Sequence, residues 1–141
     1  MKDQITKEKI LHHAIGKVWN AITSAEEIST WFLKADFKAE TGYRYTFTSP
    51  GEDCTQITGE VKHAEPYTLV YTWIVAETDV ETMVTWILKE TEEGTHLYLE
   101  HSGISNYSGD TAVQMFGSFD QGWINCVNEL SNYLKESVHA G

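Results

Sequence analysis

The sequence predicts an α+β fold in which a curved antiparallel β-sheet is covered by a long C-terminal helix. Two amphipathic helical patterns stand near opposite ends of the chain, one from Val18 to Phe32 and the other from Phe119 to Leu134. Between them lie about six strand-like stretches and no further helix of any length. A long helix that closes over a curved sheet tends to enclose an interior space, so we expect the functional site there.

Length and charge limit the class of protein. A chain of 141 residues is expected to form one domain spanning 1–141. Lys and Arg together number 10 against 21 Asp and Glu, which gives a net charge of −11. Because a polyanion is bound through basic residues, the charge argues against nucleic acid as a partner. Anionic membrane surfaces are disfavoured for the same reason.

The amino-terminal residues MKDQITKEK lack the apolar segment of a signal peptide, and no run of about 18 apolar residues follows. We therefore predict no membrane insertion and a cytoplasmic location. Cys54 and Cys126 are the two cysteines. They could be bridged, but a cytoplasmic setting favours two free thiols.

The first part of the chain is predicted to be a strand followed by two short helices. Ile5 to Ala14 has imperfect strand alternation, and Gly16 ends it. Apolar residues at helical spacing then lie on either side of Thr23–Ser24. Ser24 can cap the second helix, and Glu26 and Glu27 suit its first turn because the helix dipole favours negative charge there.

From Tyr43 onward the hydrophobic period changes to two, which is typical of half-buried strands. This alternation predicts strands at 43–48, 57–63, 69–75, 84–88 and 97–101. Turn residues separate them, with Pro50–Gly51 after the first and Glu93–Gly94 as a hairpin turn before the last. Short strands joined by short turns predict an antiparallel meander.

Residues 103–112 are predicted to be a loop, and the long helix is predicted to begin at about Thr111. Gly117 and Gly122 weaken its early part and allow a bend there. Its apolar stripe, at steps of three and four, consists of Phe116, Phe119, Trp123, Val127, Leu130 and Leu134. The segment from Gly103 to Asp110 fits either a gate at the mouth of the interior space or an ordinary strand-to-helix connection.

Aromatic residues are plentiful, with five Trp, seven Tyr and five Phe, and many fall on the face predicted to point inward. The candidate ligand-binding residues are Phe47, Tyr71, Trp73, Trp86, His101, Met115, Phe116, Phe119 and Trp123. Trp19, Trp31 and Phe32 are instead assigned to packing of the short helices. The same inward period would serve a cavity or a fully packed core, so periodicity leaves both open.

Histidines and carboxylates form no recognisable catalytic or metal-binding pattern. His12 and His13 are adjacent on a strand and face opposite sides. His63 and His101 share the inward parity, but a third ligand is lacking, so we predict no metal and no cofactor. His101 is interpreted as a polar group at the cavity wall or as a satisfied core histidine. No residue is singled out as catalytic, which favours a non-enzymatic protein.

An ordered set of short motifs adds a family resemblance. The set comprises VWNAIT at 18–23 followed by Trp31–Phe32, then Gly42, GEV at 59–61, LVYTW at 69–73, VTW at 84–86, EGTHLYLEHSG at 93–103 and GW at 122–123. In these motifs the chain resembles the START/Bet v 1-like (SRPBCC) superfamily, and within it the group similar to the C-terminal domain of the activator of the 90-kDa heat shock protein ATPase. The resemblance implies a helix-grip fold, in which a curved antiparallel sheet wraps around the C-terminal helix and two short helices follow the first strand.

Members of that superfamily hold a lipid, sterol, polyketide or flavonoid between sheet and helix. Others stimulate a chaperone ATPase, sequester a toxic compound or catalyse cyclisation. We therefore expect this chain to bind a small hydrophobic molecule, in a role related to stress or toxins, as a monomer or weak dimer. The alternative is a chaperone partner that stimulates ATP turnover, and a cyclase or hydrolase is the third hypothesis.

Overall fold

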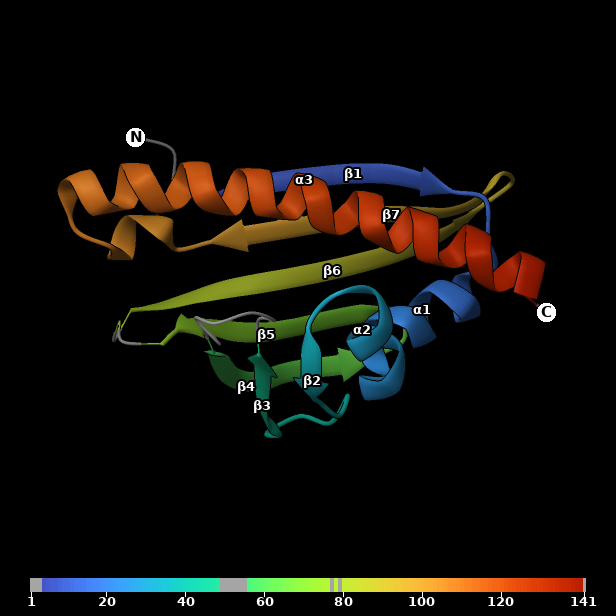
Figure 1. Ribbon diagram of the computed structural model, residues 1–141, viewed down its shortest axis with the longest axis horizontal. Helices are drawn as coiled ribbons and strands as arrows, with labels where there is room; N and C mark the ends of the chain where they lie inside the picture. The colour runs from blue at the N-terminus through green and yellow to red at the C-terminus, as the bar shows by residue number, and fades with distance from the viewer. Residues whose placement is uncertain (1–3, 49–55, 77, 79, 141) are drawn as a thin grey trace.

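The computed structural model describes residues 4–48, 56–76, 78 and 80–140, and side chains as far as Lys135. The elements in chain order are β1 (Ile5–Leu11), α1 (Ile15–Thr23), α2 (Ala25–Trp31), β2 (Lys34–Asp36), β3 (Arg44–Thr48), β4 (Gln56–Glu65), β5 (Thr68–Val75), β6 (Glu81–Thr91), β7 (Gly94–Ser102), the 3-10 turn η1 (Ile104–Asn106) and α3 (Gly109–Ala140). Figure 1 shows α3 running along the length of the sheet, with α1 and α2 beside its carboxyl-terminal half.

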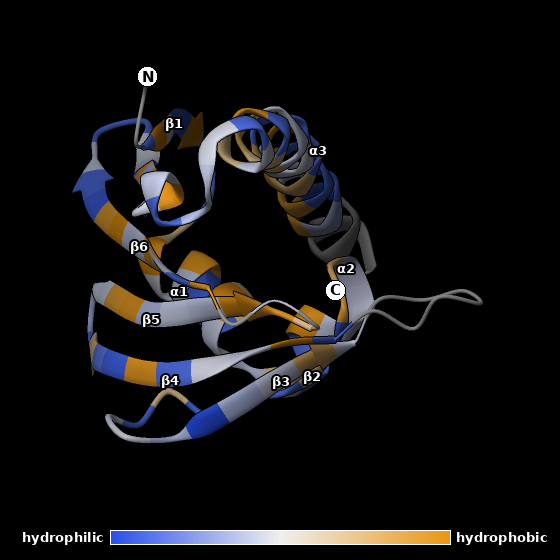
Figure 2. Cartoon of the chain, turned by 90° about the vertical axis from the view of Figure 1, so that its left-hand side faces the viewer, coloured by the Kyte–Doolittle hydropathy of each residue, from blue (hydrophilic) through white to orange (hydrophobic). Residues whose placement is uncertain are grey.

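The described strands form one seven-stranded sheet in the order β1-β7-β6-β5-β4-β3-β2. Every neighbouring pair is antiparallel. The sheet curves strongly, and α3 lies on its concave side (Figure 2). The predicted α+β class, the antiparallel meander and the helix-grip arrangement are therefore confirmed.

The two short helices follow the local pattern of the sequence. In α1 the inward face consists of Val18, Ala21 and Ile22, all buried. Ser24 caps α2 as expected, since its hydroxyl oxygen accepts a hydrogen bond from the backbone N–H of Glu27 at 3.5 Å.

The core lies between the concave face of the sheet and one stripe of α3. Strand β7 shows the pattern clearly, because Leu97, Leu99 and His101 are buried and alternate with half-exposed residues. Among the side chains of α3 that the structure describes, the buried ones are Ala112, Trp123, Cys126, Val127, Leu130 and Leu134. The later part of the predicted stripe is thus fully buried, whereas Phe116 and Phe119 are half-buried.

Four sequence predictions need correction. Strand β1 ends at Leu11 rather than Ala14, because the chain bends at His12–His13 to enter α1. The short strand β2, which pairs with β3, was not predicted. A β-bulge between Val61 and His63 shifts the register of β4, so His63 is exposed rather than inward.

The fourth correction concerns the approach to α3. The predicted loop contains η1, and α3 begins at Gly109, two residues before Thr111. Ile104 and Tyr107 are buried in the core and anchor this connection. The predicted turn at Pro50–Gly51 and the side chain of Cys54 lie outside the described residues, while Cys126 is a buried free thiol.

Among the residues that the structure describes, no helix is both long enough and apolar enough to span a membrane.

Candidate functional site

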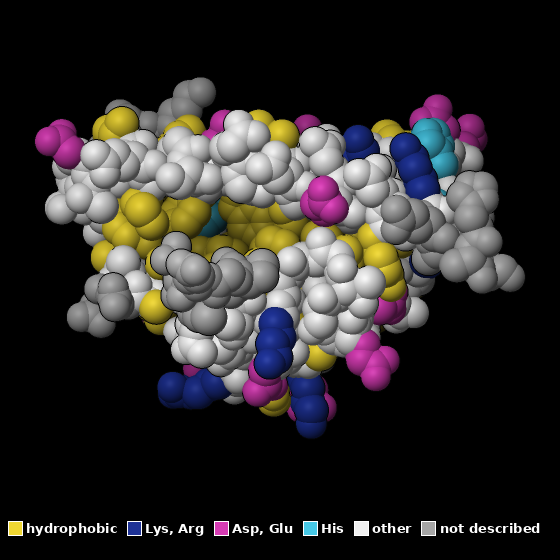
Figure 3. Space-filling model, in the orientation of Figure 1, with side chains coloured by type: hydrophobic (Ala, Val, Ile, Leu, Met, Phe, Trp, Pro, Cys, Tyr) yellow, Lys and Arg dark blue, Asp and Glu magenta, His cyan; other side chains and the backbone are white. Residues whose placement is uncertain are grey.

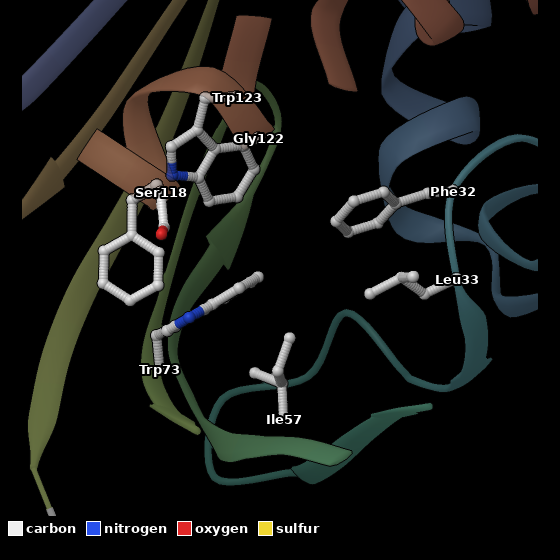
Figure 4. Close-up of a pocket in the computed structure, with 8 residues that line it drawn as sticks. Phe32, Leu33, Ile57, Trp73, Ser118, Gly122 and Trp123 are labelled. Atoms are coloured by element: carbon white, nitrogen blue, oxygen red, sulfur yellow. The ribbon is translucent and has the colours of Figure 1, made fainter. Parts of the chain in front are cut away.

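An apolar cleft of about 270 Å³ opens between α3, the end of α2 and the strands β4 and β5. Its lining consists of Phe32, Leu33, Ile57, Trp73, Ser118, Phe119, Gly122 and Trp123. Figure 3 shows the cleft as an elongated hydrophobic hollow beneath α3, and Figure 4 shows how the labelled side chains face one another across it. The lining contains no charged side chain among the described residues.

The cleft exists because α3 does not lie directly on the middle of the sheet. Its backbone packs against β1 and η1 and against α1 and α2. It reaches the middle strands through large aromatic side chains, above all Trp123. The ring of Trp123 lies 5.2 Å from that of Trp73 on β5 and 6.0 Å from that of Trp86 on β6, measured between centroids. The sheet and helix are therefore held apart on one side, which leaves the space open.

The opposite wall comes from the end of α2. Phe32 stacks on Trp31 at 5.3 Å and meets Phe47 edge-on at 5.7 Å between ring centroids. It also lies 6.2 Å from Trp123, so it faces α3 across the cleft. Sequence reasoning assigned Phe32 to helix packing alone and did not select Leu33. Their position just after a capped helix, next to a run of strands, is the signal that could have found them.

Three of the nine candidate residues line the cleft, namely Trp73, Phe119 and Trp123. Phe47, Tyr71 and Trp86 instead surround a void of about 10 Å³ deeper in the core, which also touches Phe32. A void of that size holds at most one water molecule. Met115 and Phe116 are half-buried and pack against the core, but they are not part of the cleft wall.

His101, the ninth candidate, is fully buried behind Trp123. The indole Nε1–H of Trp123 donates to His101 Nδ1 at 2.9 Å. Since an indole can only donate, Nδ1 must be the unprotonated nitrogen and the ring proton sits on Nε2. Nε2–H then donates to Thr82 Oγ1 at 2.7 Å, and the Thr82 hydroxyl donates to the carbonyl oxygen of Trp73 at 3.2 Å.

This chain of hydrogen bonds keeps His101 neutral. Burial lowers its pKa from 6.5 to about 4, because a charged imidazolium would lose its hydration. Both ring nitrogens are occupied, so His101 orients Trp123 at the cleft wall rather than facing the cleft itself.

His63 does not join His101. It is exposed, and its strand β4 is separated from β7 by β5 and β6. Across the described part of the chain, no three His, Cys, Asp or Glu side chains come together in a way that could hold a metal ion.

Comparison with known proteins gives a family and a set of similar structures. The sequence profile described as "Activator of Hsp90 ATPase homolog 1-like protein" matches residues 12–135. None of the curated proteins matches the chain. Among solved structures, a Mesorhizobium loti protein is 30% identical with a TM-score of 0.83, over 94% of this chain and 97% of that one. A Bacillus halodurans protein is 33% identical with a TM-score of 0.74, over 92% and 95% of the two chains.

A third similar structure is that of DynU16, a protein of the dynemicin biosynthetic locus. It is 24% identical with a TM-score of 0.81, and the match covers 96% of this chain and 48% of DynU16. This chain therefore spans about half the length of DynU16, and the likeness concerns the fold.

Proposed function

The chain belongs to the family of activator of Hsp90 ATPase homolog 1-like proteins, and we propose that it binds a small hydrophobic compound in the cleft beneath α3. The observation that carries this function is the cleft itself, an apolar space of about 270 Å³ bounded by Phe32, Trp73 and Trp123. Sites for small molecules have this general form, with a mostly apolar lining and few polar groups.

The size of the cleft points to a compact ligand. Small-molecule pockets commonly measure roughly 300–1,000 Å³, while an apolar cavity of about 150 Å³ already binds benzene. A compound with one to three fused or linked rings, of polyketide or flavonoid type, fits this range better than a long lipid chain. Its ring faces would contact the indoles and Phe32, whose π-systems favour offset or edge-on stacking. Sequestering such a compound would suit a role related to stress or toxins.

A fluorescent probe with a blocking variant tests this function. Gly122 lines the cleft, and a Cβ added there meets nothing within 4 Å. Gly122→Leu should therefore place a side chain in the cleft without disturbing the fold. The neutral probe N-phenyl-1-naphthylamine should bind the unaltered protein saturably. Gly122→Leu should lower the affinity for the probe about tenfold or more, and a tenfold loss corresponds to only ~1.4 kcal/mol of binding free energy.

Gly117→Leu is the matched control. Gly117 is an exposed glycine of the same helix with the same free space around its Cβ, but it does not line the cleft. Both variants replace a helix-weakening glycine, so effects on helix stability are shared. A probe that binds Gly122→Leu as tightly as Gly117→Leu would show that the cleft is not the binding site.

The family description favours a second candidate function, stimulation of the ATPase of a 90-kDa heat shock protein by surface contact. In that case the purified chain should raise the rate of ATP hydrolysis by the chaperone, and Gly122→Leu should raise it equally, because the substitution is confined to the cleft and leaves the rest of the surface unchanged. An unchanged hydrolysis rate would reject this candidate.

A further inference from the structure

One indole in the cleft wall lacks the hydrogen bond that the other buried indoles make. Four tryptophans are buried, and the Nε1–H groups of three donate within the protein. These bonds run from Trp31 to the Ala21 carbonyl oxygen at 2.8 Å, from Trp86 to the Tyr71 hydroxyl at 2.9 Å and from Trp123 to His101 Nδ1 at 2.9 Å. Trp73 Nε1 is equally buried but has no acceptor among the described residues.

An unmatched buried donor is unfavourable, because its hydration has been removed and nothing replaces it. The side chain of Trp73 is only 4% exposed. It nevertheless belongs to the cleft lining, and its indole reaches toward the centre of the space in Figure 4. The missing acceptor is therefore expected from a molecule that occupies the cleft.

The cleft wall also has two chemically different sides. Ser118, whose hydroxyl is the polar side-chain group of the lining besides the two indole N–H groups, lies on the same side as Trp73 in Figure 4. Phe32 and Leu33 face them from the opposite side and offer only carbon atoms. A ligand with a polar end and an apolar body would match this arrangement.

Resting on the proposed function, we infer that the ligand is a neutral ring compound with a carbonyl oxygen at one end, and that Trp73 Nε1–H donates a hydrogen bond to that oxygen. An indole nitrogen donates only, so the ligand must supply the acceptor. A carboxylate is disfavoured, because the described lining contains no Lys or Arg and the chain has a net charge of −11. The remaining apolar rings lie against Phe32 and Leu33.

The matched compounds 1-tetralone and tetralin test this class, since they differ by one carbonyl group. Their affinities should be measured by NMR titration of the unaltered protein, Trp73→Phe and Trp86→Phe. Trp73→Phe keeps an aromatic ring but removes the donor, so it should weaken 1-tetralone about fivefold, as expected for one hydrogen bond, and change tetralin less than about twofold. Trp86→Phe also removes a donor, but one already used by Tyr71, so it should not alter the ratio of the two affinities.

The unaltered protein provides a second measurement that needs no variant. Its five tryptophans should give five indole N–H signals, and the Trp73 signal should move downfield with 1-tetralone and far less with tetralin. If both compounds bind but Trp73→Phe weakens them equally and the Trp73 signal does not distinguish them, the assignment of Trp73 is overturned and the proposed function stands. If neither compound binds, the inferred ligand class is overturned, and the binding of N-phenyl-1-naphthylamine decides separately whether the proposed function stands.

Discussion

Replacing His101 by glutamine should remove a pH dependence from the stability of the protein. In the folded state Trp123 and Thr82 hold the imidazole neutral, and burial lowers its pKa to about 4. In the unfolded chain the same histidine titrates near 6.5. Glutamine does not titrate, and its amide can still accept one hydrogen bond and donate another.

Proton linkage gives the direction and the size of the change in unfolding free energy that His101 causes as the pH falls. Between pH 6.5 and 4 the unfolded chain binds a proton that the folded chain does not, so the contribution of His101 is complete above pH 6.5 and decreases as the pH falls. With a folded pKa of about 4, the lost stability amounts to about 2 kcal/mol at pH 5 and about 3 kcal/mol at pH 4.

Urea unfolding followed by tryptophan fluorescence, from pH 7.5 down to pH 5, measures this loss. The other five of the six histidines are common to both proteins, so the difference in unfolding free energy between unaltered protein and His101→Gln isolates His101. That difference should shrink by about 2 kcal/mol across the range. Two parallel curves would refute the neutral, hydrogen-bonded state derived for His101.

Two further pairs of substitutions test the packing, each by urea unfolding. Gly59→Ala should destabilise by about 3 kcal/mol, because a Cβ there would lie 2.1 Å from the Thr72 carbonyl oxygen. The control is Gly16→Ala in α1, where an added Cβ meets no atom within 4 Å. This substitution should leave the free energy of unfolding unchanged or raise it by up to about 1 kcal/mol. Equal effects of the two substitutions would contradict the close approach of the strands at Gly59. Leu130→Ala removes a fully buried side chain of α3 and should cost about 2–5 kcal/mol. Ile124→Ala on the same helix, where the side chain is 38% exposed, should cost about 1 kcal/mol or less, and a comparable loss at both positions would place Leu130 outside the core.

The fold could be predicted from the sequence because hydrophobic period reports local structure directly. Period two marks the strands β3 to β7, and the apolar stripe of α3 marks a helix that buries one face. Two features escaped this reasoning. Strand β2 has only three residues, too few to show a period. The bulge after Val61 inserts one residue, which reverses the predicted face of His63.

The candidate site could be predicted less completely. The hydrophobic period of a strand shows which side chains point inward, but it does not show whether α3 or an open space lies over each of them. Trp73 and Trp86 share the inward parity, and both are buried. Trp73 borders the cleft and Trp86 does not, because the difference depends on how α3 sits over the sheet. Phe32 and Leu33 were missed for a related reason, as their role depends on a contact across the cleft with a helix about 90 residues further along the chain.

The size of residues along one row of α3 explains where the cleft opens. Residues four apart lie on neighbouring turns of one helix face, and the row at this spacing reads Ser118, Gly122, Cys126, Leu130 and Leu134. The first two are small and line the cleft, Cys126 is a small buried thiol, and both leucines are fully buried. The helix therefore fills the space beside α1 with large side chains and leaves it unfilled opposite Phe32. Ser118 and Gly122 lie beside the apolar stripe rather than in it, and their small size leaves the cleft open at this part of the helix. A pair of small residues four apart, next to an apolar stripe on a helix that covers a sheet, is therefore a sequence feature worth testing as a marker of such a cleft.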